Sequence, residues 1–153
     1  MTDLTPRFDG WEAKVRNSFA RQNAMHSLGI EIAQIEPGRL TLEMPFNAEF
    51  AQQHGFLHAG IVTTALDSCC GYAAHSLMEE DASVLSVEFK SNFLAPAKGE
   101  LFLFRGEVVK SGRTISVANA TAYSVSEGRE KAIATMTATL MAVRDRPDVS
   151  EGQ

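Results

Sequence analysis

Apolar residues recur at helical spacing near the start of the chain, and this spacing then changes to strict alternation. The helical set, separated by arginine and lysine, consists of Trp11, Val15, Ser18, Phe19 and Gln22. This pattern predicts an N-terminal helix over residues 10–25. Alternating apolar and polar positions over residues 30–32 and 40–44 surround the turn sequence Glu36-Pro37-Gly38, which predicts a β-hairpin.

A second helix is expected in the middle of the chain, over residues 58–79, after a loop over residues 45–57 that shows no clear period. Small residues dominate this helix: Ala59, Gly60, Ala65, Ser68, Cys69, Gly71, Ala73, Ala74 and Ser76. Glycine costs about 1 kcal/mol in a helix interior, so this composition indicates that close packing is needed on nearly every side. We therefore expect the central helix to be enclosed by the rest of the fold.

Only strands are predicted after the central helix. Alternation bounded by turn residues marks residues 84–93, 100–110, 114–125 and 131–143. Because the connections are short, these strands are expected to pair antiparallel. The order of elements predicts an α+β fold in which a long, curved antiparallel sheet wraps one helix, with a further helix at the N-terminus. We expect a single domain over residues 1–153, with flexible tails at residues 1–9 and 144–153.

Length and charge exclude several classes of function. The 153 residues are 44% hydrophobic, and 14 basic against 19 acidic residues give a net charge of −5 without any basic block. A nucleic-acid partner is therefore not expected. We see no secretory leader and no apolar run near the roughly 20 residues that cross a bilayer, so no membrane partner and a cytoplasmic location are expected.

The two cysteines, Cys69 and Cys70, are adjacent in the sequence. Neighbouring residues of a helix point in different directions, so they cannot form a disulfide framework. A nucleophilic cysteine needs an adjacent base and an electropositive setting, and the sequence shows neither. We expect both cysteines to be small core residues of a reduced protein.

A single carboxylate, Asp67, lies in the middle of the apolar helix, nine residues after His58. Such a group must be desolvated, paired or used in chemistry, and from the residues alone a structural and a catalytic role both stay open. A zinc site formed by His54, His58 and Asp67 is not expected, because the spacing lacks a close pair of ligands on one helical face. No metal or other cofactor is predicted.

The spacing of these polar residues resembles the hotdog-fold thioesterases, in particular the PaaI-type acyl-CoA hydrolases. In that family the helix begins with His-Gly-Gly, an Asn or Gln lies six residues before the histidine, and an Asp or Glu lies nine residues after it. Gln52, His58 and Asp67 match these offsets, while Ala59 replaces the first glycine. The similarity extends over residues 27–143 and includes the segments 86–97 and 110–113. It implies hydrolysis of an acyl- or aryl-acyl-CoA thioester to free acid and CoA.

The resemblance suggests a role for each matching residue. Asp67 would act as a general base toward water or as a nucleophile, and Ser86 would hold the attacking water. The backbone N–H of Ala59 at the positive end of the helix would form an oxyanion hole. Gln52 would donate to the thioester carbonyl or hold the substrate, with His58 orienting Gln52 or the loop. Purely structural alternatives stay open for Gln52, His58 and Ser86 as loop, cap and strand residues.

Four further residues are expected to contact the acyl-CoA substrate. Gly60 belongs to the helix start, and Phe56 is one of the residues whose packing sets the length of the acyl pocket. Lys90 and Arg113 are candidates to bind the phosphates of CoA, although isolated basic residues on strands and turns are usually only solvated. The sequence does not indicate the length or aromatic character of the acyl group.

Helix geometry makes the proposed site a property of two chains. At ~1.5 Å per residue, His58 and Asp67 are separated by about 13 Å along the helix axis. Two such helices packed antiparallel about a two-fold axis would place the N-terminus of one beside the middle of the other. We therefore expect a homodimer, or a dimer of dimers, with composite sites.

Two other functions are compatible with the same fold. An acyl-thioester hydratase or dehydratase would use His58 and Asp67 for proton transfer, but the Gln52 offset and the His-Ala-Gly start are typical of the hydrolases. A non-catalytic acyl-CoA-binding hotdog domain would regulate another activity. Such sensors usually carry a separate DNA-binding module, and this short acidic chain shows none.

Overall fold

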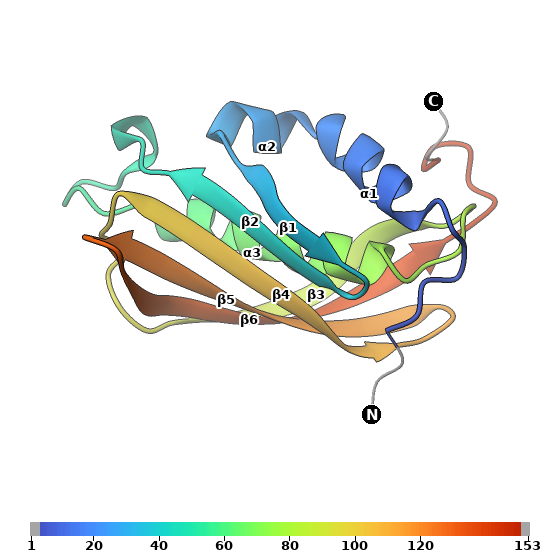
Figure 1. Ribbon diagram of the computed structural model, residues 1–153. Coiled ribbons are helices and arrows are strands. Elements are labelled where there is room, and N and C mark those ends of the chain that lie inside the picture. Colours follow the sequence, from blue (N-terminus) through green and yellow to red (C-terminus); the bar gives the residue numbers. More distant parts are fainter. Residues whose placement is uncertain (1–3, 151–153) are drawn as a thin grey trace.

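The core of the molecule is a six-stranded antiparallel sheet that curves around one long helix (Figure 1). The computed structural model describes residues 4–150. The strands are β1 (Glu31–Glu36), β2 (Arg39–Pro45), β3 (Ser83–Phe93), β4 (Leu101–Ser111), β5 (Ile115–Ser126) and β6 (Arg129–Val143). Their order across the sheet is β1-β2-β4-β5-β6-β3. The predicted α+β architecture, with a curved antiparallel sheet around one helix, is confirmed.

The enclosed helix is α3 (Ala59–His75), and it contacts every strand from β2 to β6. Its small side chains allow backbone to approach closely. The Cys69 thiol lies 3.3 Å from the carbonyl oxygen of Leu40 and 3.2 Å from that of Phe104. A Cβ on Gly106 of β4 would lie only 2.9 Å from Cys69 Sγ. Glycine at that position is therefore required by the close contact of helix and sheet.

Helix α3 ends at His75, four residues before the predicted end. Leu77 and Met78 donate to the carbonyls three residues earlier, at 3.1 Å each, so the α-helical pattern tightens and stops. Ser76 secures this end, because its hydroxyl donates to the carbonyl of Ala73 and accepts from the N–H of Gly38 in the β1–β2 turn. A side-chain contact to a distant turn thus replaces the last predicted helical turn.

The predicted single N-terminal helix is in fact two helices, α1 (Trp11–Ala20) and α2 (Asn23–Leu28). Gln22 between them has extended backbone angles, with φ −82° and ψ 95°. Arg21 and Gln22 donate to the carbonyls three residues earlier, at 3.1 and 3.0 Å, so the α-helical pattern of α1 tightens and stops. Val15 and Met25 both reach the core, where they are 0% and 1% exposed.

Strand β3 lies at an edge of the sheet and pairs only with β6, although the next strand in sequence is β4. The free edge carries large exposed apolar residues: Leu85, Val87, Phe89 and Phe93. The prediction of antiparallel pairing is confirmed, and so is the hairpin of β1 and β2. The connection from β2 to α3 is largely irregular and contains one short 3₁₀ helix, Ala48–Phe50.

The segment after β6 runs along the surface. Arg144 donates to the carbonyl of Arg113 at 2.9 Å, and the Ser83 hydroxyl donates to the carbonyl of Val149 at 3.4 Å. The single-domain and flexible-tail assignments stay predictions, and residues 1–3 and 151–153 of the tails lie outside the described residues. In the part of the chain that the structure covers, no helix has the length and apolar character to cross a membrane.

Candidate active site

The first turn of α3 leaves one backbone amide available. His58 is the N-cap, and its Nδ1 accepts from the Gly60 N–H at 2.8 Å. The N–H groups of Ile61 and Val62 donate to the His58 carbonyl at 2.9 and 3.1 Å. Within residues 4–150 the Ala59 N–H has no acceptor. A single free donor therefore lies at the positive end of the helix, where a negative oxygen is stabilised best.

Gln52 lies in the loop before α3 and uses only half of its side-chain amide for the fold. Its Oε1 accepts from the Phe56 N–H at 3.3 Å and from the His54 N–H. The side-chain nitrogen has no acceptor among the described residues. Gln52 Oε1 thus supports the loop, and the side-chain nitrogen of Gln52 stays available as a donor to a bound group.

Gln52 and Ala59 line the same cavity, which has a volume of about 420 Å³. Phe56 and Val62 form part of its wall, and residues 93–97, at and after the end of β3, also line it. That segment is tied to the loop, because the Leu57 N–H donates to the Ala97 carbonyl at 3.0 Å. The cavity therefore combines a largely apolar wall with two donors.

Asp67 lies two and a half turns further along α3 and does not line this cavity. Its half-buried carboxylate accepts a hydrogen bond of 2.7 Å from the Ser86 hydroxyl. An irregularity in the pairing of β3 with β6 lies between Ser86 and Glu88, and bulges of this kind redirect side chains. The structure thus places Ser86 in direct contact with Asp67, and the water-holding role expected of Ser86 stays a prediction.

Asp67 and Ser86 instead line a smaller cavity of about 120 Å³. The other lining residues come from α1, the connection between α1 and α2, α3 and β3: Ser18, Gln22, Ser68, Gly71, Tyr72 and Val84. One chain therefore carries the donors in one cavity and the carboxylate in another. Sequence reasoning missed the wall residues of the smaller cavity, and the one available signal was Gly71 in the interior of a helix.

The cysteines pack as predicted from the sequence, and neither is activated. Both thiols are free, and both residues are 0% exposed. Burial, together with the nearby Asp67 carboxylate, raises the pKa of Cys70 to about 12. Burial also raises the pKa of Cys69. Both sulfurs stay protonated at neutral pH, which opposes a nucleophilic role.

The remaining candidates lie outside both cavities. Lys90 donates to Asn92 Oδ1 on the same strand at 2.8 Å, and Arg113 lies exposed in the β4–β5 turn. The Gly60 N–H donates to His58 Nδ1, and Gly60 lines neither cavity. Among the described residues, no three His, Cys, Asp or Glu side chains are close enough together to hold a metal ion.

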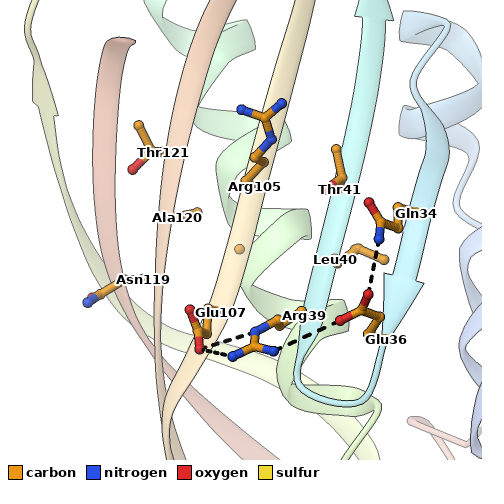
Figure 2. A pocket seen from close by; sticks show the side chains of 11 residues that line it. Gln34, Glu36, Arg39, Leu40, Thr41, Arg105, Glu107, Asn119, Ala120 and Thr121 are labelled. Atoms are coloured by element: carbon orange, nitrogen blue, oxygen red, sulfur yellow. Dashed lines mark hydrogen bonds and ion pairs between the residues drawn. The ribbon is translucent and has the colours of Figure 1, made fainter.

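A further groove of about 350 Å³ lies on the outer face of the sheet, on the side opposite α3 (Figure 2). Arg39 lies between two carboxylates there, with its guanidinium 2.9 Å from Glu107 and 3.9 Å from Glu36. Arg105 at the other end forms a two-bond pair with Glu130, at 2.7 Å for each bond. None of the predicted site residues lines this groove.

Comparison with known proteins identifies the family of the chain. Residues 54–131 match the Thioesterase superfamily. The crystal structure of a thioesterase family protein from Silicibacter pomeroyi shares 64% identity, with a TM-score of 0.87 over 88% of this chain and 99% of that one. Human acyl-coenzyme A thioesterase 13 is 28% identical over 65% of this chain and 76% of its own length. The curated relatives are matched over 64% to 76% of their own lengths.

The fold is also that of the PaaI protein from the phenylacetic acid degradation operon of Escherichia coli. Its structure gives a TM-score of 0.77 over 87% of this chain and 93% of that one, at 17% identity. The chain therefore belongs to the thioesterase superfamily and has the hotdog fold. The predicted family resemblance and the predicted class of enzyme, a thioester hydrolase, are confirmed.

Proposed function

We propose that this protein hydrolyses acyl-CoA or aryl-acyl-CoA thioesters to the free acid and CoA at a site built from two subunits. The observation that carries the proposal is that the hydrogen-bond donors near the start of α3 and the carboxylate in its middle lie in different cavities. The free donors of Ala59 and Gln52 line one cavity, whereas the carboxylate of Asp67 lines another. The name of the human relative supports CoA as the carrier.

At each site the hydrogen-bond donors of one subunit would bind the thioester carbonyl. The carboxylate of the other subunit would act on the attacking water or on the carbonyl carbon. The Ala59 N–H and the Gln52 side-chain nitrogen bind the thioester oxygen and stabilise its developing negative charge. Asp67 of the partner subunit either takes a proton from water as the water attacks the carbonyl carbon, or attacks that carbon itself to give an anhydride that water then opens. In both routes the C–S bond breaks, and CoA leaves as the thiol.

The edge strand β3 supports the homodimer. A long exposed edge with apolar side chains favours pairing with another strand, and Val87 and Phe93 are each 55% exposed. Antiparallel pairing of β3 with its copy would continue the sheet across a two-fold axis. It would also bring the two α3 helices side by side in opposite directions, which is the arrangement a composite site needs. A dimer of dimers stays part of the proposal.

His58 acts as a positioning residue in this scheme. By accepting the Gly60 N–H it fixes the first turn and leaves the Ala59 N–H free for substrate. In a hydratase or dehydratase, the same bond would oppose proton uptake at Nδ1, because that nitrogen is already occupied as an acceptor.

Substrate contacts extend the proposal beyond the reacting atoms. Phe56 lines the Ala59 cavity and would contact the bound thioester, next to the helix start at Gly60. Lys90 and Arg113 lie outside the cavities and would bind the phosphates of CoA. The proposed setting is the cytoplasm, without a membrane or nucleic-acid partner.

A screen over acetyl-, hexanoyl-, palmitoyl-, benzoyl- and phenylacetyl-CoA with detection of the released thiol tests the proposal. We expect at least one of these to be hydrolysed with a kcat/KM of about 10⁴ M⁻¹ s⁻¹ or more, the lower end of common enzyme values. Hydration of an enoyl-CoA without thiol release would support the dehydratase class instead. Tight acyl-CoA binding without turnover of any thioester would support a binding domain.

A further inference from the structure

A short hairpin in the loop before α3 carries Gln52. Ala51 and Leu57 pair across it as an antiparallel bridge, and the Gln52 N–H donates to the Phe56 carbonyl at 2.8 Å. Inside this pair the Gly55 N–H donates to the Gln52 carbonyl at 3.0 Å, which closes a tight turn. Gly55 has φ 85°, in the left-handed backbone region that a three-residue hairpin loop commonly uses at one position. The turn therefore depends on a residue whose backbone angle other side chains disfavour.

The backbone angle, and not a lack of space, is the reason for glycine at position 55. A Cβ on Gly55 would meet no atom of the described chain within 4 Å apart from its sequence neighbours. Gly128 in the β5–β6 turn shares both properties, with φ 74° and no atom within 4 Å of a Cβ. Gly128 lines neither the Ala59 cavity nor the Asp67 cavity. The two glycines are therefore a matched pair, one beside the candidate site and one remote from it.

The turn around Gly55 fixes the side-chain amide of Gln52. Both N–H groups that donate to Gln52 Oε1 belong to the hairpin loop, those of His54 and Phe56. The oxygen and nitrogen of an amide point in different directions from one carbon, so holding the oxygen on the loop turns the nitrogen away from it. Gln52 lines the cavity that contains the free Ala59 N–H. A change in the turn would move the two loop N–H groups and release the amide.

The base of the hairpin is joined to the start of α3. The His58 N–H donates to the Phe50 carbonyl at 3.0 Å, and His58 is also the N-cap of the helix. Backbone hydrogen bonds therefore set the position of Gln52 relative to the Ala59 N–H. A rigid link of this kind keeps two donors ready for one developing negative charge.

We infer that Gly55 is a positioning residue for thioester hydrolysis, because its left-handed turn holds the Gln52 amide with the nitrogen free to donate to the thioester oxygen. The inference rests on the proposed function and adds to it a residue that lines neither cavity. Gly55 acts through Gln52, so a change at Gly55 should matter only while Gln52 is present. The oxyanion forms in the transition state, so the loss should fall on kcat more than on KM.

Gly55→Ala is expected to lower kcat by about 10- to 100-fold, because a displacement of about 1 Å at a catalytic group can cost that much. Gly128→Ala adds the same side chain at a similar backbone angle, so it should lower the melting temperature to a similar extent and keep the wild-type kcat. Steady-state hydrolysis of the best acyl-CoA and thermal melting measure the two effects. Unchanged kcat in a folded Gly55→Ala protein, or a loss confined to KM, would overturn the role of Gly55.

Gly55→Asn separates the backbone angle from the presence of a side chain. Asparagine adopts left-handed backbone angles more readily than alanine, so kcat should recover to within about 3-fold of wild type. A loss as large as that expected for alanine would mean that the backbone angle is not the cause. That result would overturn the inference even if the alanine variant fails to fold.

A double-variant cycle tests whether Gly55 acts through Gln52. Gln52→Ala alone should lower kcat by about 10²-fold, the cost of one oxyanion donor. Adding Gly55→Ala to this variant should lower kcat by no more than about 2-fold further, because the amide that the turn holds is gone. If the two losses multiply instead, Gly55 affects catalysis by another route and the inference is wrong.

These outcomes separate the inference from the proposed function. If wild type hydrolyses no acyl-CoA, the proposed function fails. If wild type and Gln52→Ala behave as expected but Gly55→Ala is fully active, or the two losses multiply, only the positioning role of Gly55 fails. A fully active Gln52→Ala protein would remove Gln52 from the proposed oxyanion hole, and the role of Gly55 with it.

Discussion

Asp67→Asn is expected to fold normally and to lose at least ~100-fold in kcat, because removing a positioned base or nucleophile costs about that much or more. The change is nearly isosteric. The amide oxygen of asparagine can still accept the hydrogen bond that Ser86 now gives to Asp67 at 2.7 Å. Packing around α3 is therefore kept, and the loss reports on the carboxylate alone. The expected loss is the same for the general-base and the nucleophilic route.

The measurement is steady-state hydrolysis of the best acyl-CoA, with thermal melting to confirm the fold. Asp81→Asn is the matched control, because Asp81 is exposed on the connection between α3 and β3 and should retain wild-type turnover. Turnover at the wild-type rate in a folded Asp67→Asn protein would remove Asp67 from the mechanism.

Ala59→Pro is expected to lose about 10²- to 10³-fold in kcat, the cost of removing one oxyanion donor. Ala59 is the first residue of α3, a position at which proline is well tolerated because the missing N–H makes no helical bond. His58 before it has φ −60° and ψ 136°, which a residue preceding proline adopts readily. Proline thus deletes the free N–H and leaves the helix intact.

Ala59→Gly is the control for this experiment, since glycine restores the His-Gly-Gly start and keeps the N–H. It should retain activity within a few-fold of wild type and melt slightly lower. If Ala59→Pro is folded and fully active, the oxyanion is stabilised by some other group.

The sequence predicted the central elements well, because local patterns specify them. The small residues of the central segment indicated an enclosed helix, and strict alternation indicated the strands. The offsets from Gln52 to His58 and from His58 to Asp67 identified the family. These signals depend only on neighbours in the sequence.

The sequence could not predict features that depend on distant contacts. The helix break at Gln22 and the early end of α3, where Ser76 binds the β1–β2 turn, are not visible in the local pattern of apolar residues. Short connections suggested neighbouring strands, yet β3 crosses to the far edge beside β6. The division of the site residues between two cavities also requires the folded chain.

Subunit complementation tests the shared site most directly. Ala59→Pro removes the donor but leaves Asp67, and Asp67→Asn removes the acid but leaves the donor. In a mixed dimer one composite site receives both intact groups and the other receives neither. The test requires that each parent variant be nearly inactive alone and that subunits exchange completely, which native mass spectrometry of the mixture would verify.

The two variants are unfolded together, refolded at equal concentration and assayed for acyl-CoA hydrolysis. Random assembly makes about half of the dimers mixed, each with one working site of two, so a shared site predicts recovery of about a quarter of the wild-type activity. Activity no higher than the mean of the two parents, in a sample shown to contain mixed dimers, would mean that each active site is built within a single chain.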